Sequence, residues 1–182
     1  MALQLTTSYL HDSLTLFHYY KNLAERAIAQ VSDEQLTSAL DPEMNSIAVI
    51  VKHISGNMQS RFTDFLTTDG EKPTRNRDAE FTDPPIARQP LLALWEQGWS
   101  CLFQTLESLC EEDLARTIAI RGEAHSVMQA INRQIAHYSY HCGQIVLLAK
   151  HFCADEWQSL SVPRGQSSEF NRRVLAREAS QR

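Results

Sequence analysis

The chain has 182 residues, of which 43% are hydrophobic and 21% charged, a composition typical of a folded domain and outside the range of disordered or fibrous chains. Gly and Pro occur only six times each, which disfavours a fold built from many short strands and turns. The formal net charge is -5, and an acidic chain disfavours nucleic acid as a partner because phosphates need a concentrated basic face.

The predicted location of the protein is the cytoplasm. No apolar run is long enough to span a membrane, and the N-terminus lacks the charged start and apolar stretch of a signal peptide. For the same reason we expect no membrane partner. The four cysteines lack the C-x-x-C spacing of zinc and redox motifs, so we expect reduced thiols.

Two long helices are predicted in the first third of the chain. Residues 7–31 carry apolar side chains at steps of three and four, as an amphipathic helix requires. Ser32 is suited to cap the connection that follows. A second helix is predicted over residues 45–66, with Asn45 or Ser46 as its cap.

A charged segment with proline and no helical stripe, residues 69–85, predicts a long loop of the kind that often carries function. A third helix is predicted from between residues 85 and 90 to about residue 110. Trp99 is central in its apolar stripe, so we expect it to be largely buried. Gly98 weakens a helix and therefore indicates a close contact with a neighbouring helix.

The last predicted helix is the clearest. Residues 111–125 are irregular, although alternation over residues 117–121 indicates a short extended piece. Helix four begins after Ser126 and reaches about residue 152, and we expect Ile135, central in its stripe, to be largely buried. Together the four segments predict an all-α fold, a four-helix bundle.

The predicted bundle covers residues 1–156 and leaves a C-terminal tail, residues 157–182. Pro163 and Gly165 supply a bend, and an amphipathic turn follows around Phe170. We expect the tail to be ordered and to pack on the bundle.

The histidines are the candidate chemistry. His137 and His141 are four residues apart on the predicted fourth helix, so both imidazoles can reach one ion. His53 occupies the equivalent flank of the second helix. Three neutral imidazoles would bind a metal and leave one position open for water or substrate. The alternative is a chance pair, because a chain with seven histidines often contains one.

Three stretches of the chain resemble the DinB-like superfamily, and more closely a bacterial branch described as a domain of unknown function. They are VKHISGNMQSRFTDFLTTDGEKPTRNRDAEF, RGEAHSVMQAINRQIAHYSYHCGQIVLLAKHF and WQSLSVPRGQSSEFN. The resemblance implies an up-down-down-up bundle, a homodimer, and a divalent metal held by His53, His137 and His141. Relatives include enzymes that act with low-molecular-weight thiols. Thr74 departs from the aromatic residue expected in the loop, which leaves the loop's role open.

Other residues are candidates for the walls of the site. Asn57 and Arg61 follow His53 at four-residue steps and share its flank. Two interpretations of Arg61 stand: an internal ion pair with a carboxylate such as Asp64 or Asp78, or a clamp on a substrate carboxylate or phosphate.

Gln134 and Gln144 lie near the histidine flank, where either could orient an imidazole through its second nitrogen. The ion itself is not specified, because three imidazoles accept Zn, Ni, Fe or Mn. The basic tail faces an acidic body, so we expect residues 157–174 to pack beside the loop at residues 69–81 and form one wall of the pocket. That wall would place Arg77 or Arg164 near an anionic small-molecule substrate.

Two functions are compatible with these features. The first is a metal-dependent enzyme, a transferase or hydrolase that activates a thiol or water on a small soluble substrate. The second is a non-catalytic, metal-stabilised bundle that acts as a binding or stress-response module. A fourth protein ligand would favour the module, and an open position would favour the enzyme.

Overall fold

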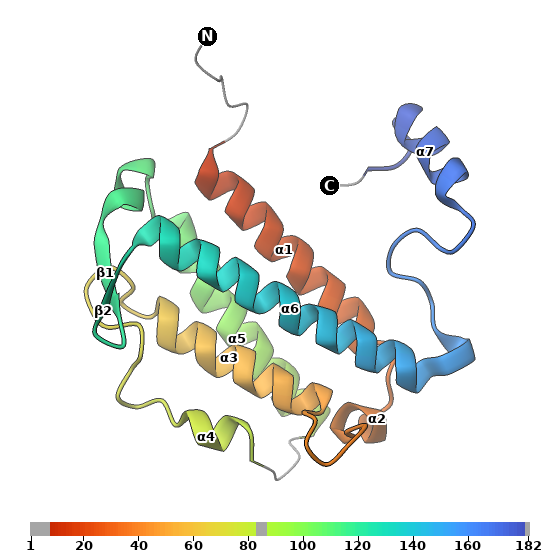
Figure 1. The fold of residues 1–182 in the computed structure, drawn as a ribbon, viewed down its shortest axis with the longest axis horizontal. Coiled ribbons are helices and arrows are strands. Elements are labelled where there is room, and N and C mark those ends of the chain that lie inside the picture. Colours follow the sequence, from red (N-terminus) through yellow and green to blue (C-terminus); the bar gives the residue numbers. More distant parts are fainter. Residues whose placement is uncertain (1–7, 83–86, 181–182) are drawn as a thin grey trace.

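The computed structural model describes residues 8–82 and 87–180, and four long helices packed lengthwise dominate it (Figure 1). These are α1 (Tyr9–Ile28), α3 (Ile47–Phe62), α5 (Arg88–Glu107) and α6 (Val127–Cys153). The predicted four-helix bundle is confirmed. The shorter elements are α2 (Asp33–Thr37), α4 (Arg77–Glu80), α7 (Ser167–Leu175), the 3-10 helices η1 (Glu111–Ala115) and η2 (Ala154–Glu156), and the strands β1 (Thr117–Ile120) and β2 (Glu123–Ser126). None of the helices in the described ranges is both long and apolar enough to cross a bilayer.

The helices α1 and α6 run parallel to each other. Near their starts, the Tyr9 hydroxyl donates to Asn132 Oδ1 at 2.8 Å. Near their ends, the Cys153 thiol donates to the carbonyl of Gln30 at 3.2 Å. Because the starts of the two helices contact each other and so do their ends, the two helices run in the same direction.

The helices α3 and α5 form a second parallel pair. Thr105 donates to the Phe62 carbonyl at 2.9 Å, and two turns earlier in both helices Gly98 lies against the backbone of Ser55. The first pair runs opposite to the second, so the order is up-down-down-up (Figure 1). The connection from α3 to α5 must therefore return along the whole bundle, and this return carries α4 past the outside of α3.

The core lies between the four helices and centres on Trp99, which is fully buried as predicted. Its ring contacts Phe17 and Tyr138 edge-on, with centroids 6.3 and 6.0 Å apart. The predicted close contact at Gly98 is confirmed, because a Cβ there would lie 3.0 Å from Ser55 Cα.

Ile135 was expected to be largely buried but is only half-buried. The helix α6 is turned so that Ile131, Gln134, Tyr138 and His141 face inward. This rotation brings the histidine flank against α3 and moves Ile135 toward the edge of the core.

Helix ends and caps follow local chemistry. Ser46 caps α3, and Ser32 and Ser126 form reciprocal capping boxes at the starts of α2 and α6. The helix α3 ends earlier than predicted because Asp64 adopts a left-handed conformation with φ of 47°. Residue 7, the predicted start of the first helix, and residue 85, the earliest predicted start of the third, lie outside the described residues.

A small hairpin connects α5 to α6. The strands β1 and β2 pair antiparallel around Arg121 and Gly122, which have φ of 56° and 77°, as a two-residue turn requires. The extended piece at residues 117–121 was expected, whereas its partner strand was not. Asp69 accepts hydrogen bonds from the backbone N–H groups of Arg121 and Gly122, at 2.8 and 2.7 Å, and so attaches the loop to the hairpin.

The tail does not form a wall of the histidine site. Its first residues pack at the far end of α1, where Gln158 exchanges hydrogen bonds with Gln30. The helix α7 has no buried residue and lies on the opposite side of the molecule from α4 (Figure 1). Arg164 is exposed on this segment, so its predicted place near the metal is wrong. Trp157 and Leu160 pack against the core at the start of the tail, whereas the apolar side chains of α7 are too few to bury that helix against the bundle.

Candidate metal centre

Three histidines from two antiparallel helices converge at the middle of the bundle. His53 comes from α3, and His137 and His141 come from successive turns of α6. One nitrogen of each ring lies within 4.8 Å of the others, and His53 Nε2 is 3.2 Å from His137 Nε2. Two imidazoles on a tetrahedral zinc ion have nitrogens about 3.4 Å apart for bonds of about 2.05 Å. The sequence-based expectation that these rings face one point is confirmed.

Each ring is oriented through its other nitrogen. His53 Nδ1 donates to Glu80 Oε2 at 2.9 Å, and His141 Nδ1 donates to Gln144 Oε1 at 2.8 Å. His137 Nδ1 lies 3.5 Å from Gln134 Oε1. The predicted placement of both glutamines is therefore seen. With the proton on Nδ1, the lone pair of each Nε2 is free for an ion.

Glu80 is the residue that the sequence did not reveal. It lies on α4 in the return connection, and its side chain is about 10% exposed. Arg75 binds both carboxylate oxygens of Glu80, with Nε and Nη2 donating hydrogen bonds of 2.7 and 2.8 Å. Burial alone would raise the pKa of Glu80, but the hydrogen bonds from His53 and Arg75 outweigh it and lower the pKa. Glu80 is thus a charged acceptor for the His53 ring at neutral pH.

The approach of Glu80 to α3 depends on a glycine. A Cβ on Gly56 would lie 3.0 Å from Glu80 Cδ and closer still to Oε1. Any larger residue would displace the carboxylate. This glycine stands three residues after His53, so the same turn of α3 supplies the ligand and the space for its orienting partner.

The two histidines of α6 are neutral at physiological pH. Burial, reinforced by the charges of His141 and His53, lowers the pKa of His137 to about 3. Burial likewise lowers the pKa of His141 to about 4. His141 Nε2 is buried and has no hydrogen-bond partner, which is costly for a polar atom unless a cation takes the lone pair. The donor set therefore fits a divalent transition-metal ion.

A cleft of about 380 Å³ opens beside His53 and His137. Asn57, Arg61 and Arg77 line it as expected, whereas Arg164 does not. The lining also includes Arg75, a further loop arginine that the sequence offers as a candidate for an anionic ligand. Four other lining residues were not singled out from the sequence: Arg121, Arg133, Ala136 and Tyr140. Their spacing carries no motif, because they meet only through the packing of the hairpin, the return connection and α6.

Arg61 has a structural role, because it binds the loop that follows α3. Its guanidinium donates to the Gly70 carbonyl and to Glu71 Oε2, the latter at 2.9 Å. The predicted internal ion pair with a loop carboxylate is confirmed, but the partner is Glu71 and not Asp64 or Asp78, because the loop folds back over α3 and brings Glu71 to Arg61. Asn57 is also engaged, since it accepts a hydrogen bond of 2.9 Å from the Tyr138 hydroxyl.

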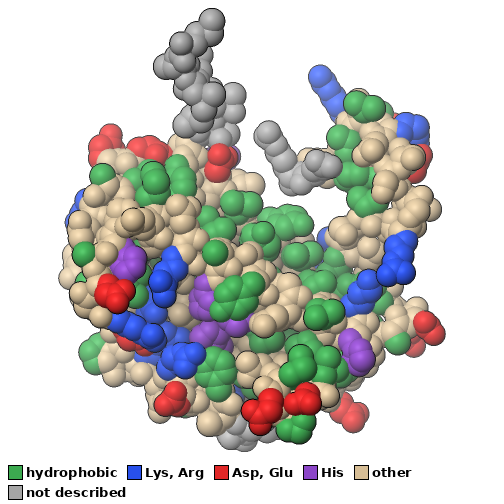
Figure 2. All heavy atoms as spheres, in the orientation of Figure 1, with side chains coloured by type: hydrophobic (Ala, Val, Ile, Leu, Met, Phe, Trp, Pro, Cys, Tyr) green, Lys and Arg blue, Asp and Glu red, His purple; other side chains and the backbone are tan. Residues whose placement is uncertain are grey.

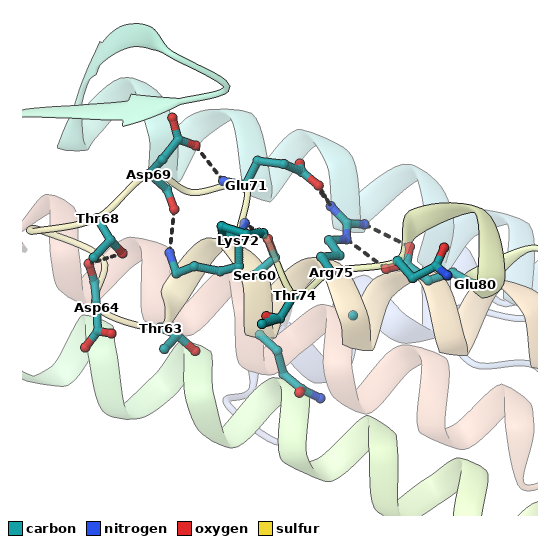
Figure 3. Close-up of a pocket in the computed structure, with 14 residues that line it drawn as sticks. Ser60, Thr63, Asp64, Thr68, Asp69, Glu71, Lys72, Thr74, Arg75 and Glu80 are labelled. Atoms are coloured by element: carbon teal, nitrogen blue, oxygen red, sulfur yellow. Dashed lines mark hydrogen bonds and ion pairs between the residues drawn. The ribbon is translucent and has the colours of Figure 1, made fainter.

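A larger pocket of about 680 Å³ lies on the other side of Glu80, under the return connection (Figure 3). Arg75 spans from Glu71 to Glu80 along its wall, and Lys72 lies beside Ser60 (Figure 3). The three histidines are absent from its lining. The reactive groups therefore belong to the smaller cleft. The larger pocket is lined by the ion-pair network that lies behind that cleft, formed by Glu71, Arg75 and Glu80.

A profile of known proteins matches residues 4–166 of the chain. The chain belongs to the DUF1572 family of proteins of unknown function. No curated protein matches. This membership confirms the expected resemblance to a family described as being of unknown function.

Solved structures share the fold at low sequence identity. A conserved protein from Enterococcus faecalis superposes with a TM-score of 0.64 at 13% identity and covers 82% of this chain and 100% of its own. YfiT from Bacillus subtilis, a probable metal-dependent hydrolase with an unusual four-helix bundle topology, has a TM-score of 0.61 at 15% identity. That alignment covers 87% of this chain and 95% of YfiT.

Proposed function

We propose that this protein is a metal-dependent enzyme that holds a divalent ion through His53, His137 and His141 and acts on a small soluble substrate. The observation that carries the proposal is the convergence of three free Nε2 atoms beside an open cleft. A bound divalent ion supplies Lewis-acid chemistry that lowers the pKa of a coordinated thiol or water. The likeness to YfiT, a probable metal-dependent hydrolase, supports this proposal.

An enzyme is favoured over a purely structural metal site by the donor set. Within residues 8–82 and 87–180, no cysteine or carboxylate joins the three rings as a fourth ligand. Glu80 is close, but it binds the Nδ1 side of His53 and is held there by Arg75. The position facing the cleft is thus left to substrate or solvent, as in catalytic zinc sites.

The lining of the cleft favours a thiol over water as the activated group. Water attack usually needs a carboxylate or histidine as general base. No Asp or Glu is among the described residues that line this cleft, and the histidines that do, His53 and His137, are the proposed metal ligands. A thiol gives up its proton more readily and needs no base once it is coordinated. A low-molecular-weight thiol is therefore our preferred co-substrate, and hydrolysis is the second reaction to test.

The test begins with metal content. The protein is purified without added metal and analysed by mass spectrometry for Zn, Ni, Fe and Mn, and Zn²⁺ binding is titrated at pH 7. His137→Ala should abolish tight binding, whereas His151→Ala, a change at an exposed histidine on the same helix, should not. Equal metal stoichiometry in the two variants would refute the site.

The metal-loaded protein is then screened for transfer of thiols to electrophiles and for hydrolysis of small esters and amides. Turnover that disappears in His137→Ala supports the enzyme. Tight metal binding with a large loss of stability on chelation, and no turnover in either screen, would favour the non-catalytic module. A homodimer and a cytoplasmic location stay predictions, to be tested by light scattering and cell fractionation.

A further inference from the structure

The cleft beside the histidines is lined by positive charge. Five of its residues are arginines and none is acidic, and Figure 2 shows basic side chains gathered next to the histidines on this face. The arginines are Arg61, Arg75, Arg77, Arg121 and Arg133. They come from α3, the return connection, the hairpin turn and α6, so the cluster is built by the tertiary fold.

Three of these arginines are paired with carboxylates that lie behind the cleft. Arg75 binds Glu80 and Glu71, and Arg61 and Arg121 bind Glu71 at 2.9 and 3.1 Å. Two carboxylates thus face three guanidinium groups, and both carboxylates lie outside the cleft lining. The pairs hold the loop in place and neutralise only part of the positive charge of the five arginines, so the cleft keeps a net positive charge.

The other two arginines have no carboxylate partner among the described residues. Arg133 precedes His137 by one turn of α6 and so lies on the same flank of the helix. Arg77 lies over the ring of Phe81 at 4.9 Å, and Phe81 in turn contacts the His53 ring with centroids 4.7 Å apart. Each of the two helices that supply the histidines thus has, near its ligand, one guanidinium group without a carboxylate partner in the described part of the chain: Arg133 on α6, and Arg77 beside His53 of α3 through Phe81.

A third donor lies deeper in the cleft. Arg61 is 6% exposed, and its Nε–H is buried with no acceptor. Buried N–H groups are nearly always satisfied, so an orphan donor on a cleft wall indicates a missing acceptor. Arginine forks match the planar or tetrahedral oxygens of carboxylates and phosphates.

We propose that the cleft selects a small substrate that carries a carboxylate or phosphate group, bound by Arg77 and Arg133 at the rim and by Arg61 Nε deeper in the cleft. This inference rests on the proposed function, since it names the chemical class of the substrate for that site. The anionic group would sit on the arginines while the reactive part faces the histidines. A volume of about 380 Å³ suits a small molecule and excludes a folded polymer.

The test measures anion binding by the metal-free full chain, so that it does not depend on the metal or on turnover. Inorganic phosphate and malonate are titrated by calorimetry at constant ionic strength, with chloride as the reference salt. Arg77→Gln and Arg133→Gln are compared, singly and together, with Arg173→Gln. That last change removes the same charge from an exposed position on α7, away from the cleft.

The double variant should bind at least one of the two probes roughly tenfold more weakly than the wild type, because charge-assisted hydrogen bonds are lost. Arg173→Gln should bind as the wild type does. Loss for phosphate alone identifies a phosphate ligand, and loss for malonate alone identifies a carboxylate.

Equal affinities in all variants, or no anion binding by the wild type, would overturn the inference. Zn²⁺ stoichiometry is measured on the same samples and should be unchanged. If anions bind through these arginines but Zn²⁺ does not bind at all, the proposed function fails while the anion site stands. If Zn²⁺ binds and the variants bind anions equally, only this inference fails.

Discussion

Gly56→Ala tests how the fold supports the metal centre, because one added methyl group should disturb a ligand's partner without touching the ligand. The new Cβ would lie 3.0 Å from Glu80 Cδ and closer to Oε1, nearer than Cβ atoms approach other atoms in proteins. Glu80 must therefore move. It would leave positions that now accept three hydrogen bonds of 2.7 to 2.9 Å from Arg75 and His53.

Two opposing contributions set the size of the effect. Alanine in place of glycine inside a helix stabilises by about 0.5–1 kcal/mol. Each hydrogen bond to a charged group contributes about 1.5–3 kcal/mol, and partial rearrangement of Glu80 would recover some of the three. We expect a net loss of about 1–3 kcal/mol in the free energy of unfolding. Metal affinity should fall about 10- to 100-fold, because His53 loses the carboxylate that orients it.

Gly143→Ala is the matched control. Gly143 lies within α6, and a Cβ there meets no atom within 4 Å, so this variant shows the helix effect alone. It should gain about 0.5–1 kcal/mol and bind Zn²⁺ as the wild type does. Both variants are measured by urea denaturation of the metal-free protein and by competitive Zn²⁺ titration. If Gly56→Ala were stabilised like the control and bound Zn²⁺ equally well, the role assigned to Glu80 would be wrong.

Three further predictions concern the bundle around the site. Because the folded-state pKa values of His137 and His141 are about 3 and 4, below the ordinary 6.5, the unfolded chain takes up protons first as pH falls. The free energy of unfolding of the metal-free protein should therefore drop between about pH 6.5 and pH 4. The drop should be at most about 1.4 kcal/mol per pH unit for each histidine, and less for the partly exposed His137. Urea titrations that find constant stability over this range would contradict this prediction. Gly98→Ala should cost about 1–3 kcal/mol by forcing α5 away from the α3 backbone, and a more stable variant would show that the helices separate freely. Tyr138→Phe should cost about 1–3 kcal/mol because it leaves the buried Asn57 Oδ1 without its donor, and calorimetry that finds no loss would argue against that hydrogen bond.

The central elements of the site could be predicted from the sequence because they depend on short spacings. His137 and His141 share a helix face through their separation of four residues, and Ser126 marks the start of that helix. His53 could be placed on the matching flank of a second helix by periodicity, and the resemblance to DinB-like proteins pointed to the same three residues. Helical periodicity repeats within a few residues, so it can be read without knowledge of the rest of the chain.

The supporting residues were decided by the tertiary structure. The pairing of Glu80 with His53, and of Glu71 with Arg61, follows from the path of the return connection, which no local pattern specifies. The same holds for Arg133, because its proposed role in anion binding depends on which residues line the cleft with it.

The tail shows the same limit. Its opposite charge suggested packing beside the loop, but charge attraction between exposed groups is weak and non-directional, whereas the hydrogen bonds between Gln30 and Gln158 fix the tail at the other end of α1. The helices and the histidines they carry can thus be predicted from local spacing, since both depend on near neighbours. The loops, charges and hydrogen bonds that surround them become visible only in the folded chain, because those contacts join residues far apart in the sequence.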